Sequence, residues 1–90
     1  MEAKPLELGK LRLVPGGNYH VVFHFRDHDG ALHEPPEEWT FRGYDFLPYD
    51  SGLTLYVAWP DGSEGAMRFR WESEFDAHIL DAFDQHISAF

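Results

Sequence analysis

The chain contains no cysteine, no long hydrophobic run and few basic residues. The absence of cysteine excludes disulfides, zinc sites built on cysteine, and thiol catalysis. The first ten residues, MEAKPLELGK, are charged where a signal peptide needs an apolar core. No run approaches the roughly 18 apolar residues of a membrane helix. We therefore expect a cytoplasmic protein that does not associate with a membrane.

Positive charge is scarce, because 16 acidic residues stand against 7 basic ones and give a formal net charge of -9. A field of this sign repels phosphate backbones, so nucleic acid is not expected as a direct partner. Residues 46–90 hold eight of the acids and only two arginines. A basic protein would be steered to that half of the chain, although a charge that serves only solubility explains the same imbalance.

Aromatic side chains are abundant and make up 17% of the 90 residues. A chain of this length forms one small domain and buries only about 60 to 65% of the surface that its unfolded state exposes. Each core residue must therefore bury a large apolar area. Each aromatic ring can bury roughly 150 to 250 Å². We expect a single compact domain over residues 10–90, preceded by a short, frayed N-terminus at residues 1–9.

Alternating apolar and polar residues predict four strands, at about residues 18–26, 37–43, 52–59 and 65–71. Asp29 and Gly30 are a signal for a two-residue hairpin turn. Pro35 and Pro36 withhold two backbone donors, so the returning strand should be interrupted there or lie at a sheet edge. Prolines at an edge also oppose strand addition from another molecule, and we expect a monomer or a weak homodimer.

From Ser73 onward the apolar period changes from two to about four. Phe75, Ile79 and Phe83 begin this stripe, which predicts an amphipathic helix at about residues 74–89 with Ser73 as its N-cap. Such a helix must cover an apolar face, and a small curled antiparallel sheet of four to five strands supplies one. The expected fold is α+β but mainly β, an SH3-like barrel with a C-terminal helix packed on it.

An aromatic segment between the second and third predicted strands is the first candidate binding surface. Tyr44 and Tyr49 combine a rigid ring with a polar hydroxyl, as interface anchors do, and Asp50 adds charge beside Tyr49. Asp81 and Asp84 extend the acidic surface on the predicted helix. Packing of the loop against the barrel explains the same aromatics, so both interpretations stay open.

Six histidines raise the alternative of a metal or small-ligand site. With a two-residue hairpin turn, His33 would lie diagonally beside His24 and His28 on one surface, roughly 7 to 8 Å away. Two of these rings could converge on zinc or nickel, although solvated histidines on a polar face fit the same pattern. A calcium loop does not fit this segment, because its twelfth position would fall on Pro36 and not on a bidentate glutamate.

Three segments, PGGNYHV, FRDHDG and EEWTFRGYDFLPYDSGLTLYV, resemble a family of small, mostly bacterial domains of unknown function. The shared motifs are PG-x-x-Y-x-V, F-x-D-x-DG, E-x-W-x-F-x-G and F-L-P-Y-x-x-GLTL, and the resemblance covers most of the chain from about Val14. Pro36 stands where the family has glycine before the acidic residue and tryptophan. The resemblance implies a fold similar to SH3-like barrels, and it carries no catalytic or binding residue over to this chain.

The spacing of residues does not point to an enzyme. No spacing forces a nucleophile toward a base, or two carboxylates to a catalytic separation, so we expect no enzymatic activity and no cofactor. The leading hypothesis is a non-enzymatic module that binds a basic protein, and a toxin-neutralising immunity protein is one form of it. The alternative is a metal- or small-ligand-binding domain centred on His24, His28 and His33.

Overall fold

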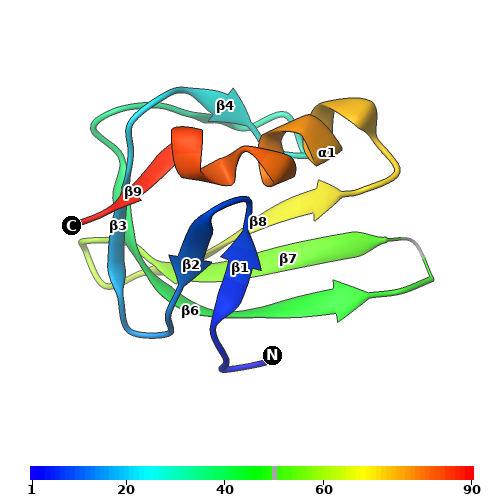
Figure 1. The fold of residues 1–90 in the computed structure, drawn as a ribbon. Coiled ribbons are helices and arrows are strands. Elements are labelled where there is room, and N and C mark those ends of the chain that lie inside the picture. Colours follow the sequence, from blue (N-terminus) through cyan, green and yellow to red (C-terminus); the bar gives the residue numbers. More distant parts are fainter. Residues whose placement is uncertain (50) are drawn as a thin grey trace.

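The computed structural model describes residues 1–49 and 51–90. The described chain is mainly β, with antiparallel sheets and one α-helix near its C-terminal end (Figure 1). In chain order its elements are β1 (Leu6–Leu8), β2 (Leu11–Leu13), β3 (Asn18–Val21), β4 (Phe25–Arg26), β5 (Leu32–His33), β6 (Glu38–Leu47), β7 (Gly52–Ala58), β8 (Glu64–Arg70), α1 (Glu74–Asp81), the 3-10 helix η1 (Phe83–Gln85) and β9 (Ile87–Ala89).

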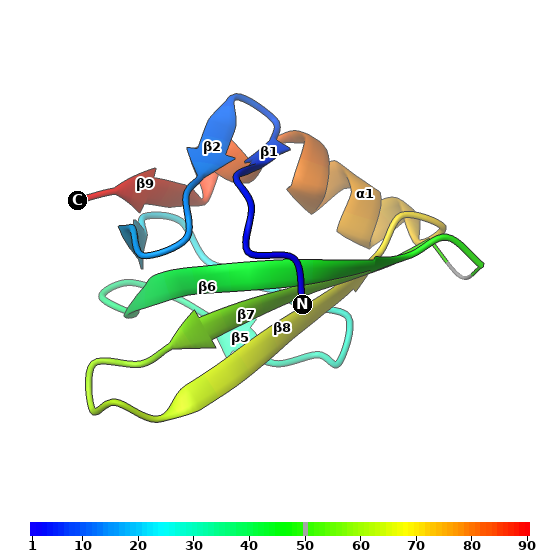
Figure 2. The same ribbon diagram turned by 90° about the horizontal axis from the view of Figure 1, so that it is seen from below.

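Five of the strands form one antiparallel sheet in the order β8-β7-β6-β3-β9, and the hairpins β1–β2 and β4–β5 are separate two-stranded sheets. The long strands β6, β7 and β8 curl beneath α1 (Figure 1). In Figure 2 the β1–β2 hairpin and α1 lie on the same side of β6. Because β8 and β9 are the two ends of the described sheet, the sheet is open, and the SH3-like barrel stays a prediction.

The inward side chains of the sheet and of the elements that cover it form one apolar core. β7 alternates strictly between buried and partly exposed residues, as a half-buried strand with a period of two does. The elements that cover the sheet, which are β1, β2, β4, α1 and η1, contribute further buried side chains. The buried members are Leu8, Leu13, Tyr19, Val21, Phe25, Trp39, Phe41, Leu53, Leu55, Val57, Met67, Phe69, Leu80, Phe83 and Ile87.

The first predicted strand, over residues 18–26, is interrupted after Val21. The backbone N–H groups of Val22 and Phe23 both donate to the carbonyl oxygen of His86, at 2.7 and 3.3 Å. Because two successive residues share one acceptor, the regular alternation of the strand is broken there. Phe23 is therefore 55% exposed, although the alternation placed it on the inward face.

The predicted helix over residues 74–89 is wrong in its second half. α1 ends at Asp81, and the chain continues as η1 and then as β9, which pairs with β3. Ile87 lies opposite Val21 in that ladder and is completely buried, so strand pairing hides the apolar side chain that a helix would also have hidden. In the described part of the chain, no helix has the length and apolar character that a membrane crossing requires.

Residues 1–9 take part in the fold, contrary to the frayed N-terminus that we predicted. β1 pairs with β2, and Leu8 is only 2% exposed in the core. Glu2 and Tyr44 exchange backbone hydrogen bonds of 2.6 and 3.0 Å. The adjacent Gly43 makes this approach possible, because a Cβ atom there would lie 2.6 Å from the carbonyl oxygen of Glu2.

We expect Leu8→Ala to lower the free energy of unfolding by about 2 to 4 kcal/mol, because it removes a buried side chain from the core. Val14→Ala is the matched control. Val14 is 43% exposed, and its truncation should change the free energy by less than about 0.5 kcal/mol. Urea denaturation of both variants measures the two values. A Leu8→Ala variant as stable as the wild type would show that β1 does not support the core.

Candidate functional site

The β4–β5 hairpin carries two of the three histidines of the metal hypothesis. Its loop spans residues 27–31 and is closed by a hydrogen bond from the backbone N–H of Asp27 to the carbonyl oxygen of Ala31, at 3.1 Å. Phe25 therefore pairs with His33, which is one residue away from the register that a two-residue turn would give. A slip of one residue turns a strand's side chains to the opposite face, so His33 points inward.

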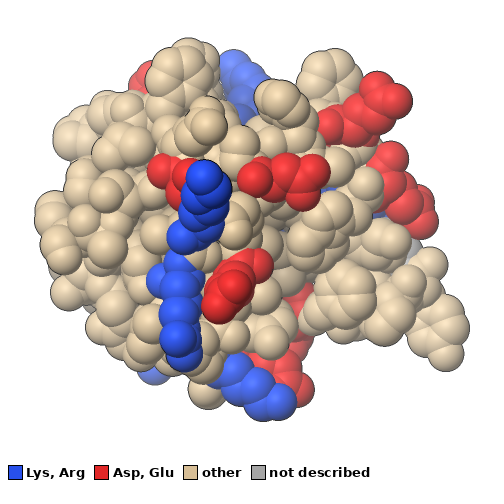
Figure 3. Space-filling model, in the orientation of Figure 1, with Lys and Arg blue, Asp and Glu red and all other residues tan. Residues whose placement is uncertain are grey.

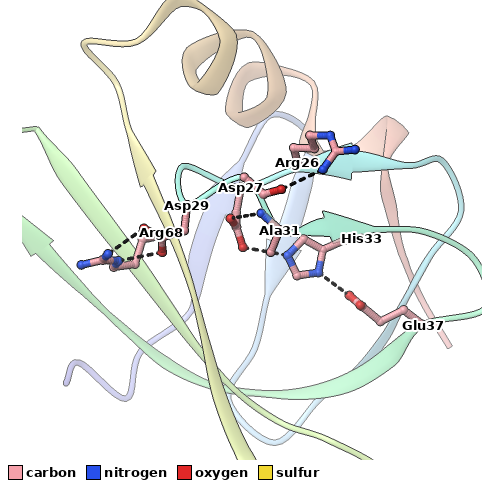
Figure 4. A network of polar contacts seen from close by, with 8 residues as sticks. Arg26, Asp27, Asp29, Ala31, His33, Glu37 and Arg68 are labelled. Carbon is pink, nitrogen blue, oxygen red and sulfur yellow. Dashed lines mark hydrogen bonds and ion pairs between the residues drawn. The ribbon is translucent and has the colours of Figure 1, made fainter.

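His33 is buried between two carboxylates (Figure 4). Its Nε2 atom lies 2.9 Å from Oδ2 of Asp27, and its Nδ1 atom lies 2.7 Å from Oε2 of Glu37. Asp27 also accepts the backbone N–H of Ala31 at 3.0 Å. The ring of Phe25 stacks on the imidazole, with the ring centroids 4.9 Å apart. Both ring nitrogens of His33 are thus occupied by carboxylates.

The next two residues of the loop are tied to other elements. Nδ1 of His28 lies 2.8 Å from Oδ2 of Asp76 in α1. The same Oδ2 atom accepts the backbone N–H of Arg70 in β8, also at 2.8 Å. The guanidinium of Arg68 donates two hydrogen bonds to Asp29, at 3.0 and 2.6 Å (Figure 4). These bonds hold the pKa of the Asp29 carboxyl below its ordinary value. We call the contacts of residues 27–29 and His33 the hairpin network.

The structure separates the three histidines of the metal hypothesis. His24 stacks on Phe23 with the ring centroids 4.7 Å apart, whereas His28 and His33 face different carboxylates. Among residues 1–49 and 51–90, no three histidine, aspartate or glutamate side chains are grouped so that they could hold a metal ion. The geometry therefore gives no support to a zinc or nickel site at His24, His28 and His33.

A more open site lies where the ends of β6 and β8 meet β1. An apolar hollow of about 450 Å³ is lined there by Leu6, Tyr44, Phe46, Leu53 and Trp71. The rings of Phe46 and Trp71 meet edge to face, with their centroids 5.7 Å apart. The surface that lines the hollow is almost entirely apolar. We call it the aromatic groove.

Exposed apolar side chains continue from the groove to the turn between β6 and β7. Phe46 is 48% exposed, Leu47 is 55% exposed, and Tyr49 is fully exposed. Figure 3 shows uncharged side chains gathered at the lower right of this face, with acidic side chains above them. The predicted binding residues Tyr44 and Tyr49 thus lie at the same end of the β6–β7 hairpin. Asp50, the third member of that set, lies outside the described residues.

Asp81 and Asp84 are not part of the groove. Oδ1 of Asp84 accepts the backbone N–H of Lys10 at 3.2 Å, in the turn between β1 and β2. A Cβ atom on Gly9 of that turn would lie 2.8 Å from the carbonyl oxygen of Asp81, so the turn packs closely against the end of α1. Figure 1 shows the β1–β2 turn beside the helical segment and the β6–β7 turn at the far end of the long strands. Asp84 therefore supports the fold, and Asp81 is an exposed acid beside it.

Asp45 holds the N-terminal residues against β6. Its carboxylate accepts the hydroxyl of Tyr56 at 2.6 Å and pairs with the N-terminal ammonium of Met1 at 2.9 Å. The hydrogen bond from Tyr56, followed by the one from the ammonium, lowers the pKa of the Asp45 carboxyl, and the same Tyr56 bond raises the pKa of the tyrosine. These contacts position the chain that leads into Leu6, one wall of the groove.

Sequence reasoning missed Leu6 and Trp71 as groove residues. Leu6 fell in the segment that we expected to fray. Trp71 continued the inward alternation of Met67 and Phe69, but β8 ends one residue earlier, at Arg70. Trp71 is consequently only partly buried, and its ring borders the groove. The position of an aromatic residue at the end of a strand is a signal that could have identified it.

The chain is similar to a solved bacterial protein over most of its length. That protein is an integron cassette protein from the mobile metagenome of Vibrio cholerae. The two sequences are 32% identical, the TM-score is 0.81, and the match covers 87% of this chain and 86% of the other. No family model matches the chain, and no curated protein matches it either.

Asp76→Ala should lower the free energy of unfolding by about 3 kcal/mol, because it removes the buried carboxylate that faces the His28 ring and accepts the Arg70 N–H. Glu72→Ala removes an exposed acid just before α1 and should change the value by less than about 0.5 kcal/mol. Chemical denaturation of both variants measures the difference. Equal stabilities would contradict the role of Asp76 in joining α1 to β8 and the hairpin.

Arg68→Gln should raise the pKa of Asp29 toward its ordinary value of 3.8, because the hydrogen bonds from the guanidinium favour the charged carboxylate. A carboxyl whose pKa is lowered by folding adds stability above its unfolded pKa, and this stability is lost as the pH falls through the folded pKa. The variant should therefore lose less stability than the wild type as the pH falls below about 4. NMR titration of the Asp29 carboxyl measures the shift, and an unchanged pKa would refute the pairing.

Proposed function

The chain belongs to the same family as the integron cassette protein from the mobile metagenome of Vibrio cholerae, and we propose that it is a non-enzymatic protein-binding module. Its partner is a basic protein that docks at the aromatic groove and at the exposed side chains beside it. The observation that carries this proposal is the exposure of apolar side chains around an apolar hollow, in a chain with a formal net charge of -9.

The groove and the β6–β7 turn supply the apolar part of the interface. A partner side chain between Phe46 and Trp71 would remove water from both rings, and the burial of apolar surface is the main driving force of association. Leu47 and Tyr49 would border it. Aromatic residues of this kind carry a large share of the binding energy at protein interfaces, where a few central side chains dominate.

Acidic residues supply the electrostatic part. Glu7 follows Leu6 of the groove, while Glu72 and Glu74 follow Trp71, and all three acids are exposed. A negative field around an apolar site accelerates the association of a cationic partner and disfavours anionic ones. A second copy of the chain is a poor occupant because it carries the same net charge, which supports a monomer or a weak homodimer.

The partner that fits presents an apolar side chain flanked by lysines or arginines. A basic toxin neutralised by this module would meet that description. We place the pair in the bacterial cytoplasm, since a chain without cysteine needs no oxidising compartment. We also propose that the fold is an SH3-like barrel, and the curl of β6, β7 and β8 beneath α1 supports this assignment.

Selection from a displayed library of random peptides tests the proposal. Selection on the wild-type protein should enrich peptides that combine leucine, phenylalanine or tryptophan with lysine or arginine. Binding of these peptides should weaken at least about tenfold in the double variant Phe46→Ser with Tyr49→Ser, since interface anchors are lost. Binding should also weaken at high salt, because the charge attraction is screened.

Val22→Ser is the matched control, because Val22 is 45% exposed and lies outside the groove. It should bind the selected peptides as the wild type does. Enrichment of acidic peptides, or peptides that bind the double variant and the wild type equally, would overturn the proposed interface. Circular dichroism of each variant establishes that the comparison is made between folded proteins.

A further inference from the structure

A second hollow lies between the connection from β3 to β4 and the helical segment of the chain. Its volume is about 420 Å³, and its walls include Phe23, His24, His78, Ile79, Gln85 and His86. It shares no lining residue with the aromatic groove. Three of the six histidines of the chain meet here from three different segments. We call it the histidine hollow.

Phe23 forms an exposed aromatic wall of this hollow. The break after β3 turns its ring outward, where 55% of the residue is exposed. One face of the ring stacks on His24, with the centroids 4.7 Å apart and the planes 23° apart. His86 meets the ring edge-on at 5.7 Å, and also meets Phe25 edge-on at 5.6 Å. The hollow is therefore bordered by flat rings that are suited to stacking against another ring.

Each polar side chain that lines the histidine hollow, namely His24, His78, His86 and Gln85, has an N–H group that can donate a hydrogen bond. Nδ1 of His86 lies 3.2 Å from the carbonyl oxygen of Phe23, which can only accept, so Nδ1 carries the proton and the ring is held in one orientation. His78 and Gln85 are exposed at the rim, on α1 and η1. A histidine ring gains a second N–H group as the pH falls from about 8 to 6.

Charged side chains stand around this hollow and not in its wall. Among the described residues, its lining contains no aspartate, glutamate, lysine or arginine. The nearest charges along the chain are Asp76 and Asp81, two and three residues from His78, Asp84, which precedes Gln85, and Arg26, which follows Phe25 on β4. Asp76 faces His28 and accepts the backbone N–H of Arg70, and Asp84 accepts the backbone N–H of Lys10. The chain as a whole has a formal net charge of -9 and repels anions. The lining of this hollow instead offers an anion N–H donors and no carboxylate.

We propose that the histidine hollow binds a small aromatic carboxylate. The ring of the ligand lies against Phe23 and Ile79, and its carboxylate accepts N–H groups from the histidines and Gln85 at the rim. The volume falls within the range of about 300 to 1,000 Å³ that is typical of small-ligand sites. This site is independent of the proposed protein interface, because it uses other residues and the opposite charge preference.

The test uses 1-naphthoate as the probe and 1-naphthamide as its neutral counterpart, and NMR follows the aromatic and imidazole signals. Naphthoate should shift the signals of Phe23, His24 and His86, and it should bind about tenfold more tightly at pH 6 than at pH 8, because charge-assisted hydrogen bonds are stronger. Naphthamide should show no such pH dependence.

Phe23→Ser should weaken naphthoate binding about tenfold at either pH, because it removes the stacking wall. His78→Gln should instead reduce the difference between pH 6 and pH 8, because it keeps an N–H donor but cannot gain charge. His20→Gln is the matched control, since the His20 ring packs on Phe90, with the centroids 4.4 Å apart, and does not line the hollow. It should bind as the wild type does.

Three results would overturn the site. The first is that Phe23→Ser and His78→Gln both bind naphthoate with the affinity of the wild type. The others are NMR shifts confined to Phe46 and Trp71 of the aromatic groove, and the absence of any NMR shift at about 5 mM naphthoate, which corresponds to no useful affinity. The two variants alter exposed side chains, so folding is checked from the amide spectrum of each. Peptide binding at the groove should be unchanged in both variants, which separates this result from the test of the protein interface.

Discussion

Two buried carboxylates, those of Asp27 and Asp76, hold the covering elements of this small protein to its sheet. A buried carboxylate is costly unless it is paired, so each can exist only with its partners in place. Asp27 fixes the hairpin loop and His33, on which Phe25 stacks. Asp76 joins the first turn of α1 to the edge of β8 and to His28. The closure of the core by the β4–β5 hairpin and by α1 depends on these two groups.

The same contacts decide which parts of the surface are left for binding. The carbonyl oxygen of Arg68 accepts the backbone N–H of His28 at 2.7 Å, and the N–H of Arg70 is bound by Asp76, so the outer edge of β8 is partly covered. An uncovered edge would invite strand addition from another molecule. With that edge occupied, apolar surface remains open at the end of the long strands, around Phe46, and beside the outward-turned Phe23.

Local alternation indicated β7 and β8 well, because each of their residues faces either the core or solvent according to a period of two. It did not indicate the second half of β6, which continues to Leu47 through the segment that we predicted to be a loop after residue 43. It could not indicate the pairing of the strands. A loop of five residues in place of two moved His33 from the surface to the interior, and the sequence DHDG is compatible with both. The spacing of Phe83 and Ile87 fits a helix and a strand equally, and only pairing with β3 decides between them. Tyr44 and Tyr49 could be proposed from their residue type, whereas Leu6 became a groove residue only through contacts with distant parts of the chain.

The place of Trp71 in the groove gives the molecule a built-in optical probe. Trp39 is buried in the core, and the indole of Trp59 packs closely over Gly65, so a ligand at the groove leaves the surroundings of both unchanged. Trp71 alone of the three tryptophans lines the groove, edge to face with Phe46. The fluorescence emission wavelength of an indole depends on its contact with water. A ligand that displaces water from the groove therefore shifts the emission wavelength of Trp71. Occupancy of this surface can be followed in the unlabelled protein.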